Sequence, residues 1–402
     1  MPPSAGPYRS GHRSCTWGPV SNAIPFNRAF LTGKELGYIR EAVNAGHISG
    51  DGVFTRKCQS ILQDTAGSRQ ALLTTSCTDA LEMTALLLDI KPGDEVIVPS
   101  FTFVSTVNAF VLRGAVPVFA DIRPDTLNID ETRLESLITP RTRAVLVVHY
   151  AGVGCEMEAI LALAHRHQIA VVEDNAHGLF GRYRGQPLGT FGQLATLSFH
   201  ETKNVSCGEG GALLVNDPTY SERAEIIREK GTNRAQFFRG QVDKYTWVDL
   251  GSSFLPSDLL AAFLLAQLES AELIQARRRR VWTNYQRELA GWAGREGVRL
   301  PVVPAHCEQP FHMFYLLLPS LAERQALIAQ LKAQKIMSAF HYVPLHLSPM
   351  GIRFGGRPGM CPVTEDVSDR LLRLPFYTEL SEDDQARVIA VITDHVSLRA
   401  AA

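Results

Sequence analysis

Short apolar runs and amphipathic stretches alternate along the chain between residues 71 and 216. The runs are rich in β-branched residues and show no regular alternation of polar and apolar positions. Runs of this kind are typical of strands buried on both faces of a mostly parallel sheet. We therefore predict strands over residues 71–75, 95–99, 116–122, 143–150, 169–174, 195–200 and 210–216.

The stretches between and around these runs space their apolar residues along one face of a helix. This spacing predicts helices over residues 24–48, 76–90, 156–168 and 256–289. Residues 50–67 begin with a glycine turn and continue as a helix, and residues 101–114 turn into a helix. Strands that alternate with helices in this order predict a doubly wound α/β fold. In such folds the ligand site lies at the carboxyl ends of the strands.

The pattern changes past Gly291, where prolines interrupt the sequence at Pro301, Pro304 and Pro310. An apolar run over 314–318, a helix over 321–334 and a further run over 339–346 predict a second, smaller α+β domain. Residues 1–23 are rich in Pro, Gly and Ser, which predicts a flexible tail. The predicted organisation is a tail (1–23), a large ligand-binding domain (24–265) and a small C-terminal domain (266–402).

Composition narrows the functional classes. The chain has 402 residues, of which 45% are apolar and 20% charged, with a formal net charge of -1. This balance argues against nucleic acid or a membrane surface as a partner. No apolar run approaches the roughly 20 residues that span a bilayer, and the tail does not resemble a secretory signal. The seven scattered cysteines indicate neither a disulfide framework nor a zinc site and fit a reducing, cytoplasmic location.

The stretch ATLSFHETKNVSCGEGG (195–211) carries the most specific chemistry. A predicted strand ends near Phe199, and Lys203 follows it shortly before the glycine-rich segment GEGG (208–211). A lysine held in one place can form a Schiff base with pyridoxal phosphate (PLP) when its surroundings lower the pKa of its amine. Alone, the stretch favours the commoner solvated surface lysine, so the PLP interpretation depends on the remaining candidates.

Asp174 ends the predicted strand 169–174, at the edge where ligands bind. A carboxylate in this place can keep the pyridine nitrogen of PLP protonated. We expect Glu173 to point to the opposite face of the strand. The alternative interpretation of Asp174 is the N-cap of a helix.

The start of the helix 76–90 is a candidate phosphate site. Ser76, Cys77 and Thr78 would present backbone N–H groups and hydroxyls there, although a simple Ser/Thr cap gives the same sequence. Asp79 would compete with a phosphate unless its carboxylate faces away. Ser198, near the end of its strand, could supply another hydroxyl.

Four further features are less specific. Phe103 follows a strand and could stack on a cofactor ring, although core packing is the commoner use of Phe. His177 lies three residues past Asp174, so both can face one cavity, although a lone histidine is more often structural. The run Arg277–Arg280 is typical of a solvated helix face, with substrate phosphate as the alternative ligand. The loop 341–346, with His341 at its start, lacks a zinc-protease spacing but could border a substrate pocket.

Taken in order, these motifs resemble the PLP-dependent sugar aminotransferases of the DegT/DnrJ/EryC1/StrS family, which have the aspartate-aminotransferase (type I) fold. The resemblance runs from about residue 24 to the end of the chain. Residues 229–262 and the segment RLLRLP (370–375) are more similar to the dTDP-4-amino-4,6-dideoxygalactose transaminases of bacterial surface-polysaccharide synthesis. The motifs that carry the resemblance are SCT (76–78), PSFTFVST (99–106), HYAG (149–152), VVED (171–174), SFHETKN (198–204) and GEGG (208–211).

The resemblance implies roles for individual residues. Lys203 would form the Schiff base with PLP, Asp174 would pair with the ring nitrogen, and Phe103 would stack on the ring. His177 would lie beside the ring, where the family often has Gln. The GEGG turn would let the backbone pass close to the cofactor. The residues implied to hold the phosphate are Ser76, Cys77, Thr78 and Ser198.

The family also implies a homodimer with active sites shared between subunits. Many members have an Asn that reaches the phosphate of the neighbouring subunit, and Ser252 or Ser253 would replace it here. Related sugar 3-dehydrases have His in place of the lysine, so Lys203 favours transamination.

The expected reaction transfers the amino group of L-glutamate to the 4-keto carbon of dTDP-4-dehydro-6-deoxy-D-glucose, giving dTDP-4-amino-4,6-dideoxy-D-galactose. The alternatives are another nucleotide-linked keto sugar, reacting at C3 or carried on UDP, and a non-catalytic PLP-binding regulator. No helix-turn-helix segment supports the regulator, and no GxGxxG motif supports a nicotinamide-dependent enzyme.

Overall fold

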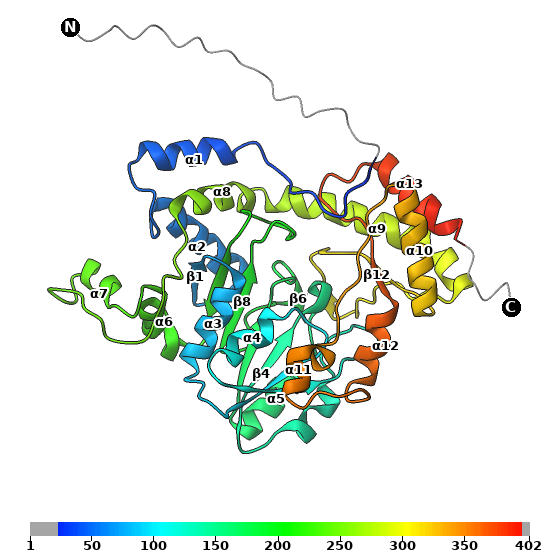
Figure 1. Ribbon diagram of the computed structural model, residues 1–402. Coiled ribbons are helices and arrows are strands. Elements are labelled where there is room, and N and C mark those ends of the chain that lie inside the picture. The colour runs from blue at the N-terminus through cyan, green and yellow to red at the C-terminus, as the bar shows by residue number, and fades with distance from the viewer. Residues whose placement is uncertain (1–22, 396–402) are drawn as a thin grey trace, which may run out of the picture.

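The apolar runs in the first half of the chain form a central seven-stranded sheet in the computed structural model, which describes residues 23–395 (Figure 1). Residues 1–22, which make up nearly all of the predicted tail, lie outside the described residues. The strand order is β1-β9-β8-β5-β4-β2-β3. These strands are β1 (Gln70–Thr74), β2 (Glu95–Pro99), β3 (Val116–Ala120), β4 (Thr142–Val148), β5 (Ala170–Asp174), β8 (Leu194–Ser198) and β9 (Gly211–Val215).

The sheet is mostly parallel, as predicted. Strand β9 pairs antiparallel with both of its neighbours, β1 and β8. Strands β8, β5, β4, β2 and β3 pair in parallel. Each strand begins and ends within two residues of its predicted bounds, so the predicted α/β fold class is confirmed.

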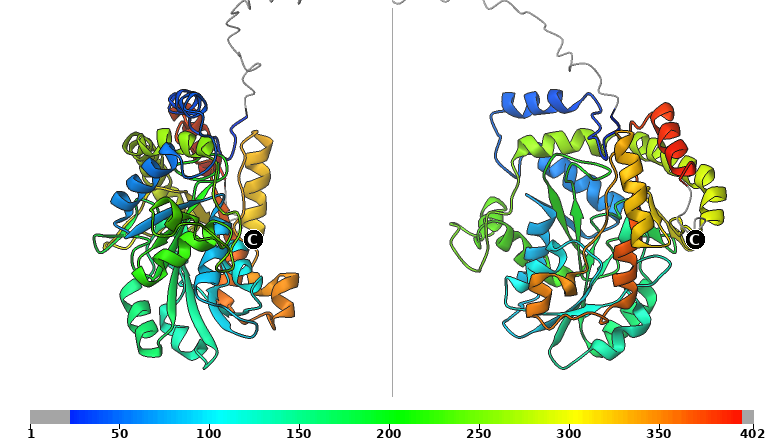
Figure 2. Two further views of the ribbon diagram at one scale, coloured as in Figure 1. Left: turned by 90° about the vertical axis from the view of Figure 1, so that its left-hand side faces the viewer. Right: turned by 45° about the vertical axis from the view of Figure 1, so that its right-hand side comes forward.

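Helices cover both faces of the sheet (Figures 1 and 2). Ser76 and Ser257 cap two of these helices, because each serine side chain accepts the N–H of the residue three positions ahead. The helices packed on the sheet are α2 (Val53–Ala66), α3 (Cys77–Leu87), α4 (Ser105–Val111), α5 (Met157–His167), α6 (Ser221–Arg228) and α8 (Asp258–Leu268).

Successive residues of a strand contribute to cores on opposite faces. In β4, Val145 and Val147 pack against α5, whereas Ala144 and Leu146 pack in the core that includes α3 and α4. Both faces are therefore covered, which explains why the strand sequences are apolar at every position.

Two helix predictions are wrong in extent. The helix predicted over 24–48 is limited to α1 (Glu35–Asn44), because Ile24 pairs instead with the C-terminal part of the chain, donating its N–H to the carbonyl of Lys335 at 2.9 Å. The single helix predicted over 256–289 is two helices, α8 and α9 (Ala271–Glu296), which meet at 60°. Helix α8 packs on the sheet, whereas α9 enters the C-terminal core, and one straight helix could not do both.

The C-terminal part has its own core and a small sheet. Strands β11 (Tyr315–Leu317) and β12 (Leu371–Arg373) pair antiparallel. Apolar residues of α9 pack with these strands and with the helices beside them. The helices are α10 (Leu321–Ala333) and α13 (Glu382–Thr393). Helix α12 (Pro362–Arg370) lies beside α10 and β11, and its Val367 belongs to a neighbouring core. The smaller α+β unit is thus present, while its predicted boundary at residue 265 stays a prediction.

The run 339–346 is not a strand, and only Ala339 forms an isolated bridge, to Arg373. Four short 3-10 helices lie in the described chain, over residues 131–137, 150–152, 218–220 and 345–347. The remaining elements are α7 (Arg234–Phe238), α11 (Pro349–Arg353), β6 (Arg182–Tyr183), β7 (Gln186–Pro187) and β10 (Cys307–Glu308).

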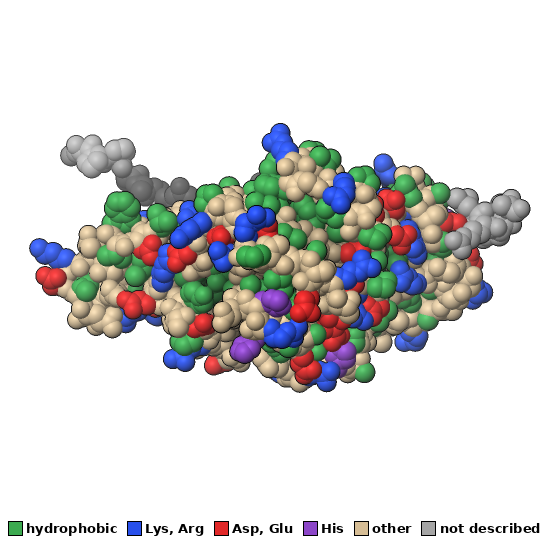
Figure 3. Space-filling model, turned by 90° about the horizontal axis from the view of Figure 1, so that it is seen from below, with side chains coloured by type: hydrophobic (Ala, Val, Ile, Leu, Met, Phe, Trp, Pro, Cys, Tyr) green, Lys and Arg blue, Asp and Glu red, His purple; other side chains and the backbone are tan. Residues whose placement is uncertain are grey.

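Within residues 23–395 no single helix is long and apolar enough to cross a membrane, and α8 and α9 meet that criterion only as a bent pair. The six cysteines in this part of the chain are free. On the face shown in Figure 3, basic and acidic side chains are interspersed and neither sign dominates.

Candidate functional site

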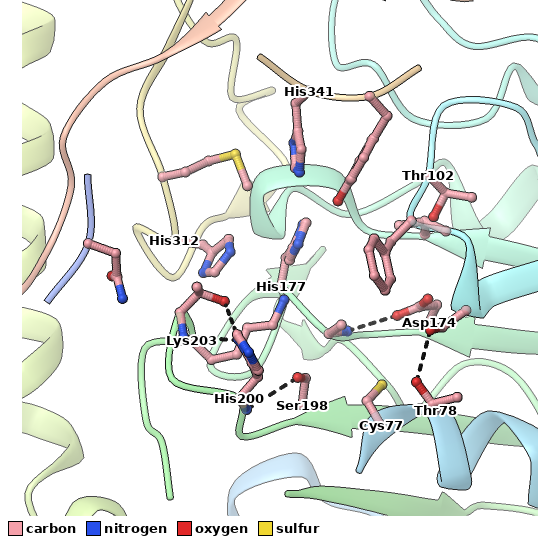
Figure 4. Close-up of a pocket in the computed structure, with 18 of the residues that line it drawn as sticks. Cys77, Thr78, Thr102, Asp174, His177, Ser198, His200, Lys203, His312 and His341 are labelled. Atoms are coloured by element: carbon pink, nitrogen blue, oxygen red, sulfur yellow. Dashed lines mark hydrogen bonds between the residues drawn. The ribbon is translucent and has the colours of Figure 1, made fainter. Parts of the chain in front are cut away.

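A cavity of about 490 Å³ lies at the carboxyl ends of β2, β4, β5 and β8 (Figure 4). Segments from the C-terminal part of the chain complete its wall. Eight of the nine predicted site residues line it, and Ser253 does not. The eight are Ser76, Cys77, Thr78, Phe103, Asp174, His177, Ser198 and Lys203.

Asp174 is buried at the end of β5 and held by two hydrogen bonds. Thr106 Oγ1 donates to its Oδ2 at 2.7 Å, and the N–H of Ala176 donates to its Oδ1 at 3.2 Å. The Thr106 hydroxyl lies 2.9 Å from the Thr102 hydroxyl. A turn rather than a helix follows Asp174, so the helix-cap interpretation is wrong and the carboxylate is oriented at the cavity.

Glu173 points to the opposite face, as expected. Its side chain accepts the N–H groups of Gly189, Phe191 and Gly192 at 2.7–2.8 Å. It also pairs with the buried His149 at 2.8 Å. This network fixes the end of β5, and with it the backbone that carries Asp174.

The start of α3 has a serine N-cap and two backbone N–H groups that have no partner within the helix. The Ser76 hydroxyl accepts the N–H of Asp79 at 3.0 Å, so Ser76 is a true helix cap. The N–H groups of Cys77 and Thr78 come first in the helix and have no carbonyl to bond within it. The Asp79 carboxylate accepts a hydrogen bond from the Thr75 hydroxyl and does not line the cavity. It therefore faces away from the position where a phosphate would lie.

Lys203 lies in the turn that follows β8. The backbone N–H of Lys203 donates to the carbonyl of His200 at 2.9 Å. The backbone N–H of His200 in turn donates to Ser198 Oγ at 3.5 Å. Burial lowers the pKa of the Lys203 amine, and the charge of Arg373 acts in the same direction, whereas Cys77 and Asp174 oppose the shift. A lysine lining a cavity with a lowered pKa is suited to nucleophilic attack on a carbonyl, and the surface-lysine interpretation is wrong.

The glycine-rich segment brings this turn and α3 together. A Cβ at Gly211 would lie 2.4 Å from the backbone nitrogen of Cys77 and 2.4 Å from the carbonyl carbon of Ser76. Gly208 has a φ of 87°, which other residues rarely adopt. The close approach at Gly211 is therefore to the start of α3. Gly210 lines the cavity, and the expected passage of this turn beside a cofactor stays a prediction.

Three histidines form one wall of the cavity. The rings of His177 and His312 stack with centroids 4.3 Å apart, and the His341 ring lies 6.2 Å from that of His177. His312 Nδ1 is 2.9 Å from Asn204 Oδ1, and His341 Nδ1 is 3.0 Å from the Tyr150 hydroxyl.

Burial lowers the pKa of all three histidines well below the usual value, so the stacked rings are neutral at pH 7. His177 Nδ1 is buried and has no hydrogen-bond partner among the described residues. The loop that begins at His341 does border the cavity, as we expected, whereas His346 is directed elsewhere and bonds Ser100 at 2.6 Å.

Of the predicted site residues Phe103 and Ser253, only Phe103 lies at the cavity. The Phe103 side chain lines the cavity and is 59% exposed, so the core-packing interpretation is wrong. Ser253 forms an isolated backbone bridge with Glu229, outside the cavity. Its contribution to the site of a neighbouring subunit stays a prediction.

The run Arg277–Arg280 is not one solvated face. Arg278 is buried and donates to the carbonyls of Phe311 at 3.0 Å and His312 at 2.5 Å. Burial lowers its pKa to about 9. None of the four arginines lines the cavity, but Arg278 holds the segment that carries His312.

Several residues at the cavity were not predicted from the sequence. Thr106 was hidden in a predicted helix, although a hydroxyl so close to a strand end, within the PSFTFVST motif, was a usable signal. His312 and Arg373 come from the C-terminal part of the chain and line the cavity opposite the sheet. No local pattern marks either of them.

These residues fit PLP. The cavity joins an acid for the ring nitrogen (Asp174), an amine for the aldehyde (Lys203) and a helix start with free N–H groups for the phosphate. The unpartnered Nδ1 of His177 would gain a partner from a polar group on the ring. In the described part of the chain, no cluster of three or more His, Cys, Asp or Glu side chains is placed to hold a metal ion.

Comparisons with known proteins agree with this site. The sequence model of the DegT/DnrJ/EryC1/StrS aminotransferase family matches residues 31–393. The spore coat polysaccharide biosynthesis protein SpsC of Bacillus subtilis is 32% identical over 381 residues, which cover 93% of this chain and 97% of SpsC.

Two solved structures are also similar. DesV of S. venezuelae, solved with a ketimine intermediate, is 30% identical with a TM-score of 0.85, covering 93% of this chain and all of DesV. The PLP form of the putative sugar aminotransferase Spr1654 of Streptococcus pneumoniae is 25% identical with a TM-score of 0.85, covering 92% of this chain and 98% of that one.

Proposed function

Because this chain belongs to the DegT/DnrJ/EryC1/StrS aminotransferase family, we propose that it transfers the amino group of L-glutamate to the 4-keto carbon of dTDP-4-dehydro-6-deoxy-D-glucose. The product would be dTDP-4-amino-4,6-dideoxy-D-galactose, a precursor of surface polysaccharide. The observation that carries the proposal is the convergence of Lys203, Asp174 and the start of α3 on one cavity.

Family membership makes the protein a PLP-dependent aminotransferase of fold type I, like the solved PLP and pyridoxamine-phosphate forms to which it is similar. When bound, PLP supplies the electron sink of the reaction and carries the amino group from donor to acceptor. The protein supplies position, charge and the groups that move protons.

Lys203 would move the proton that transamination requires. Its amine would take the proton from the α-carbon of the donor as a general base, and would then give it to the C4′ carbon of the cofactor as a general acid. The lowered pKa of this amine raises the fraction that is neutral and able to accept a proton. Asp174 would hold the proton on the ring nitrogen, with Thr106 fixing the orientation of its carboxylate.

The phosphate would bind at the start of α3. Cys77 and Thr78 offer backbone N–H groups, and the Thr78 hydroxyl lies 2.9 Å from that of Ser105. Ser198 adds a hydroxyl from the end of β8. Ser76 already uses its oxygen as an acceptor, so it would contribute only its hydroxyl proton.

The choice of sugar rests on sequence similarity. Residues 229–262 and RLLRLP (370–375) resemble the transaminases that make dTDP-4-amino-4,6-dideoxygalactose. Among relatives, SpsC is named for polysaccharide biosynthesis and Spr1654 as a putative sugar aminotransferase. The name of SpsC favours a role in polysaccharide synthesis, and that of Spr1654 favours a sugar acceptor.

We also propose a homodimer. The segment around α7 projects from the side of the molecule (Figure 1) and exposes large apolar side chains, including Phe238 at 70% and Trp247 at 76%. Apolar surface of this kind is typical of a protein interface. Packing against a second copy would cover it, and Ser253 would then reach the phosphate site of that copy.

Two experiments test the reaction. The purified protein should be yellow with PLP, and Lys203→Ala should lose the visible absorption of the Schiff base, whereas Lys91→Ala, a change at an exposed lysine, should keep it. Identical spectra for wild type and Lys203→Ala would refute the role of Lys203.

The sugar is tested by incubating the enzyme and glutamate with a panel of dTDP- and UDP-linked 4-keto and 3-keto sugars. Mass spectrometry and NMR then identify the product and its C4 configuration. We expect turnover of dTDP-4-dehydro-6-deoxy-D-glucose to the galacto product. Preferred amination of a UDP-linked or 3-keto sugar would refute the proposed acceptor while leaving the aminotransferase in place.

A further inference from the structure

Glu173 is fully buried on the face of β5 that is turned away from the cavity. Each of its two carboxylate oxygens accepts two hydrogen bonds. Oε1 accepts the backbone N–H groups of Phe191 and Gly192, both at 2.7 Å. Oε2 accepts the backbone N–H of Gly189 and the Nε2–H of His149, both at 2.8 Å. Four donors leave no acceptor for a proton on the carboxyl group itself, so Glu173 is ionised.

His149 is a neutral donor in this network. Its Nδ1 accepts the backbone N–H of Cys155 at 3.1 Å, so the ring proton is on Nε2 and points at Glu173. The imidazole ring is fully buried as well. Within residues 23–395, Glu173 is therefore a buried anion that hydrogen bonds alone stabilise, and the loss of any of them is costly.

The three backbone donors belong to one loop, residues 189–192, which leads directly into β8. Glycine lets this loop approach β5 closely, because a Cβ at Gly192 would lie 2.4 Å from the carbonyl oxygen of Val171. The carbonyls of Gly189 and Gly192 accept the side-chain N–H groups of Asn216, at 2.9 and 2.8 Å. The loop is thus fixed on two sides, by Glu173 of β5 and by the residue that follows β9.

The anchoring of β8 decides where the Lys203 amine lies, because Lys203 is in the turn that follows this strand. Strands β5 and β8 pair over three residue pairs, the last of which joins Asp174 to Thr196. Strands β8 and β9 pair over five. The bonds of Glu173 therefore reinforce the side of β8 that has less backbone pairing, and this is the side on which Asp174 lies.

We propose that Glu173 is a positioning residue that sets the place of Lys203 relative to Asp174. Figure 4 shows these two side chains on two sides of the cavity. The aldehyde carbon and the ring nitrogen of PLP lie at opposite ends of one rigid ring, so the amine and the acid must be spaced to match it. The inference rests on the PLP chemistry of the proposed function, but it does not depend on the choice of sugar.

The test compares Glu173→Gln with the matched control Glu95→Gln. The first change keeps the shape of the side chain but places an amide N–H₂ group where a carboxylate oxygen accepted two N–H groups. Glu95 is also buried, at the start of β2 and outside the cavity, and its carboxylate bonds Thr139 and Arg141. Both variants should melt at a lower temperature than the wild type, so melting alone does not separate the two roles.

Two measurements, made well below the melting temperatures, do separate them. The first is backbone hydrogen exchange of the cofactor-free protein, in which residues 189–192 should exchange faster in Glu173→Gln but not in Glu95→Gln. The second is the rate at which glutamate changes the visible absorption of the PLP-saturated protein. At saturating glutamate this rate should fall about 10- to 100-fold in Glu173→Gln, as for a misplacement of about 1 Å. The KM for glutamate should stay within a few-fold, and Glu95→Gln should match the wild type in both constants.

A saturating rate in Glu173→Gln within a few-fold of the wild type would overturn the inference, as would unchanged exchange over residues 189–192 or an equal fall in rate in Glu95→Gln. If Glu173→Gln does not fold, His149→Phe takes its place. It keeps the charge of Glu173 and removes one donor, so it should show a smaller loss of rate with the same KM. No sugar is used, so a wrong acceptor leaves these results interpretable, and hydrogen exchange needs neither the cofactor nor the donor.

Discussion

The hydrogen bond from Thr106 to Asp174 offers a sharp test of how the site holds its cofactor. Thr106 is fully buried, and its hydroxyl lies 2.7 Å from Asp174 Oδ2 and 2.9 Å from the Thr102 hydroxyl. The Thr106 proton goes to the carboxylate, so Thr102 donates to Thr106. Thr106→Val keeps the shape of the side chain and removes this link.

The size of the effect follows from the charge on the acceptor. A hydrogen bond to an ionised group contributes about 1.5–3 kcal/mol. If that stabilisation is lost from the carboxylate that pairs with the ring nitrogen, PLP affinity falls by about tenfold or more, since 1.4 kcal/mol is a factor of ten. Thr106→Ser keeps the hydroxyl and should bind PLP within a few-fold of the wild type.

The assay is a spectrophotometric titration of the apoenzyme with PLP. Thr84→Val is the matched control, because Thr84 is also fully buried but its hydroxyl bonds only the Leu81 carbonyl, away from the cavity. We expect normal PLP affinity for this control. If Thr106→Val binds PLP as tightly as Thr84→Val does, the hydroxyl does not support Asp174 and the reasoning is refuted.

The other predictions concern packing and pH. Gly211→Ala should lower the free energy of unfolding by about 1–3 kcal/mol, because its Cβ would overpack against the start of α3. The control Gly294→Ala, in open space on α9, should raise the free energy of unfolding by up to about 1 kcal/mol. If urea denaturation finds no loss of stability for Gly211→Ala, the close approach at Gly211 is contradicted. Burial lowers the pKa of His312 in the folded state below its unfolded value of about 6.5. The unfolded chain therefore gains protons first as the pH falls, and stability decreases below about pH 6.5. Urea denaturation at pH 5.5 and 7.5 should show this loss to be smaller in His312→Gln, by up to about 1.4 kcal/mol per pH unit, and equal losses in both proteins would argue against a neutral His312.

The strand ends were predictable because their signals are local. A run such as AVVED shows both where a strand stops and which residue faces the ligand edge, and Asp174 lies there. Lys203 and Ser198 follow the same logic on the next strand of the parallel set. Family resemblance then assigned the chemistry, which the pattern alone left open between a cofactor lysine and a surface lysine.

The burial of Arg278 could have been predicted from the spacing of apolar residues around it, but the run of arginines was interpreted as a solvated face. Four consecutive arginines look solvated, yet Ile274, Arg278, Val281 and Tyr285 are all buried and follow the spacing of one helix face. The helical spacing of the buried residues is here a better guide than the charge of the run. Four consecutive residues go round slightly more than one turn of a helix, so one of them faces the core. Arg278 then satisfies its donors on the carbonyls of Phe311 and His312.

His312 and Arg373 could not be found from the sequence, for a physical reason that also bears on function. Residues assigned to the cofactor lie on strand ends of one sheet, whereas His312, His341 and Arg373 lie on C-terminal segments that reach the cavity only through tertiary contacts. Arg278 and the bridge between Ala339 and Arg373 hold those segments in place. On the proposed function, the sheet edge fixes the cofactor, and the C-terminal wall closes the cavity opposite it. Changes in that wall should therefore alter turnover more than they alter PLP affinity.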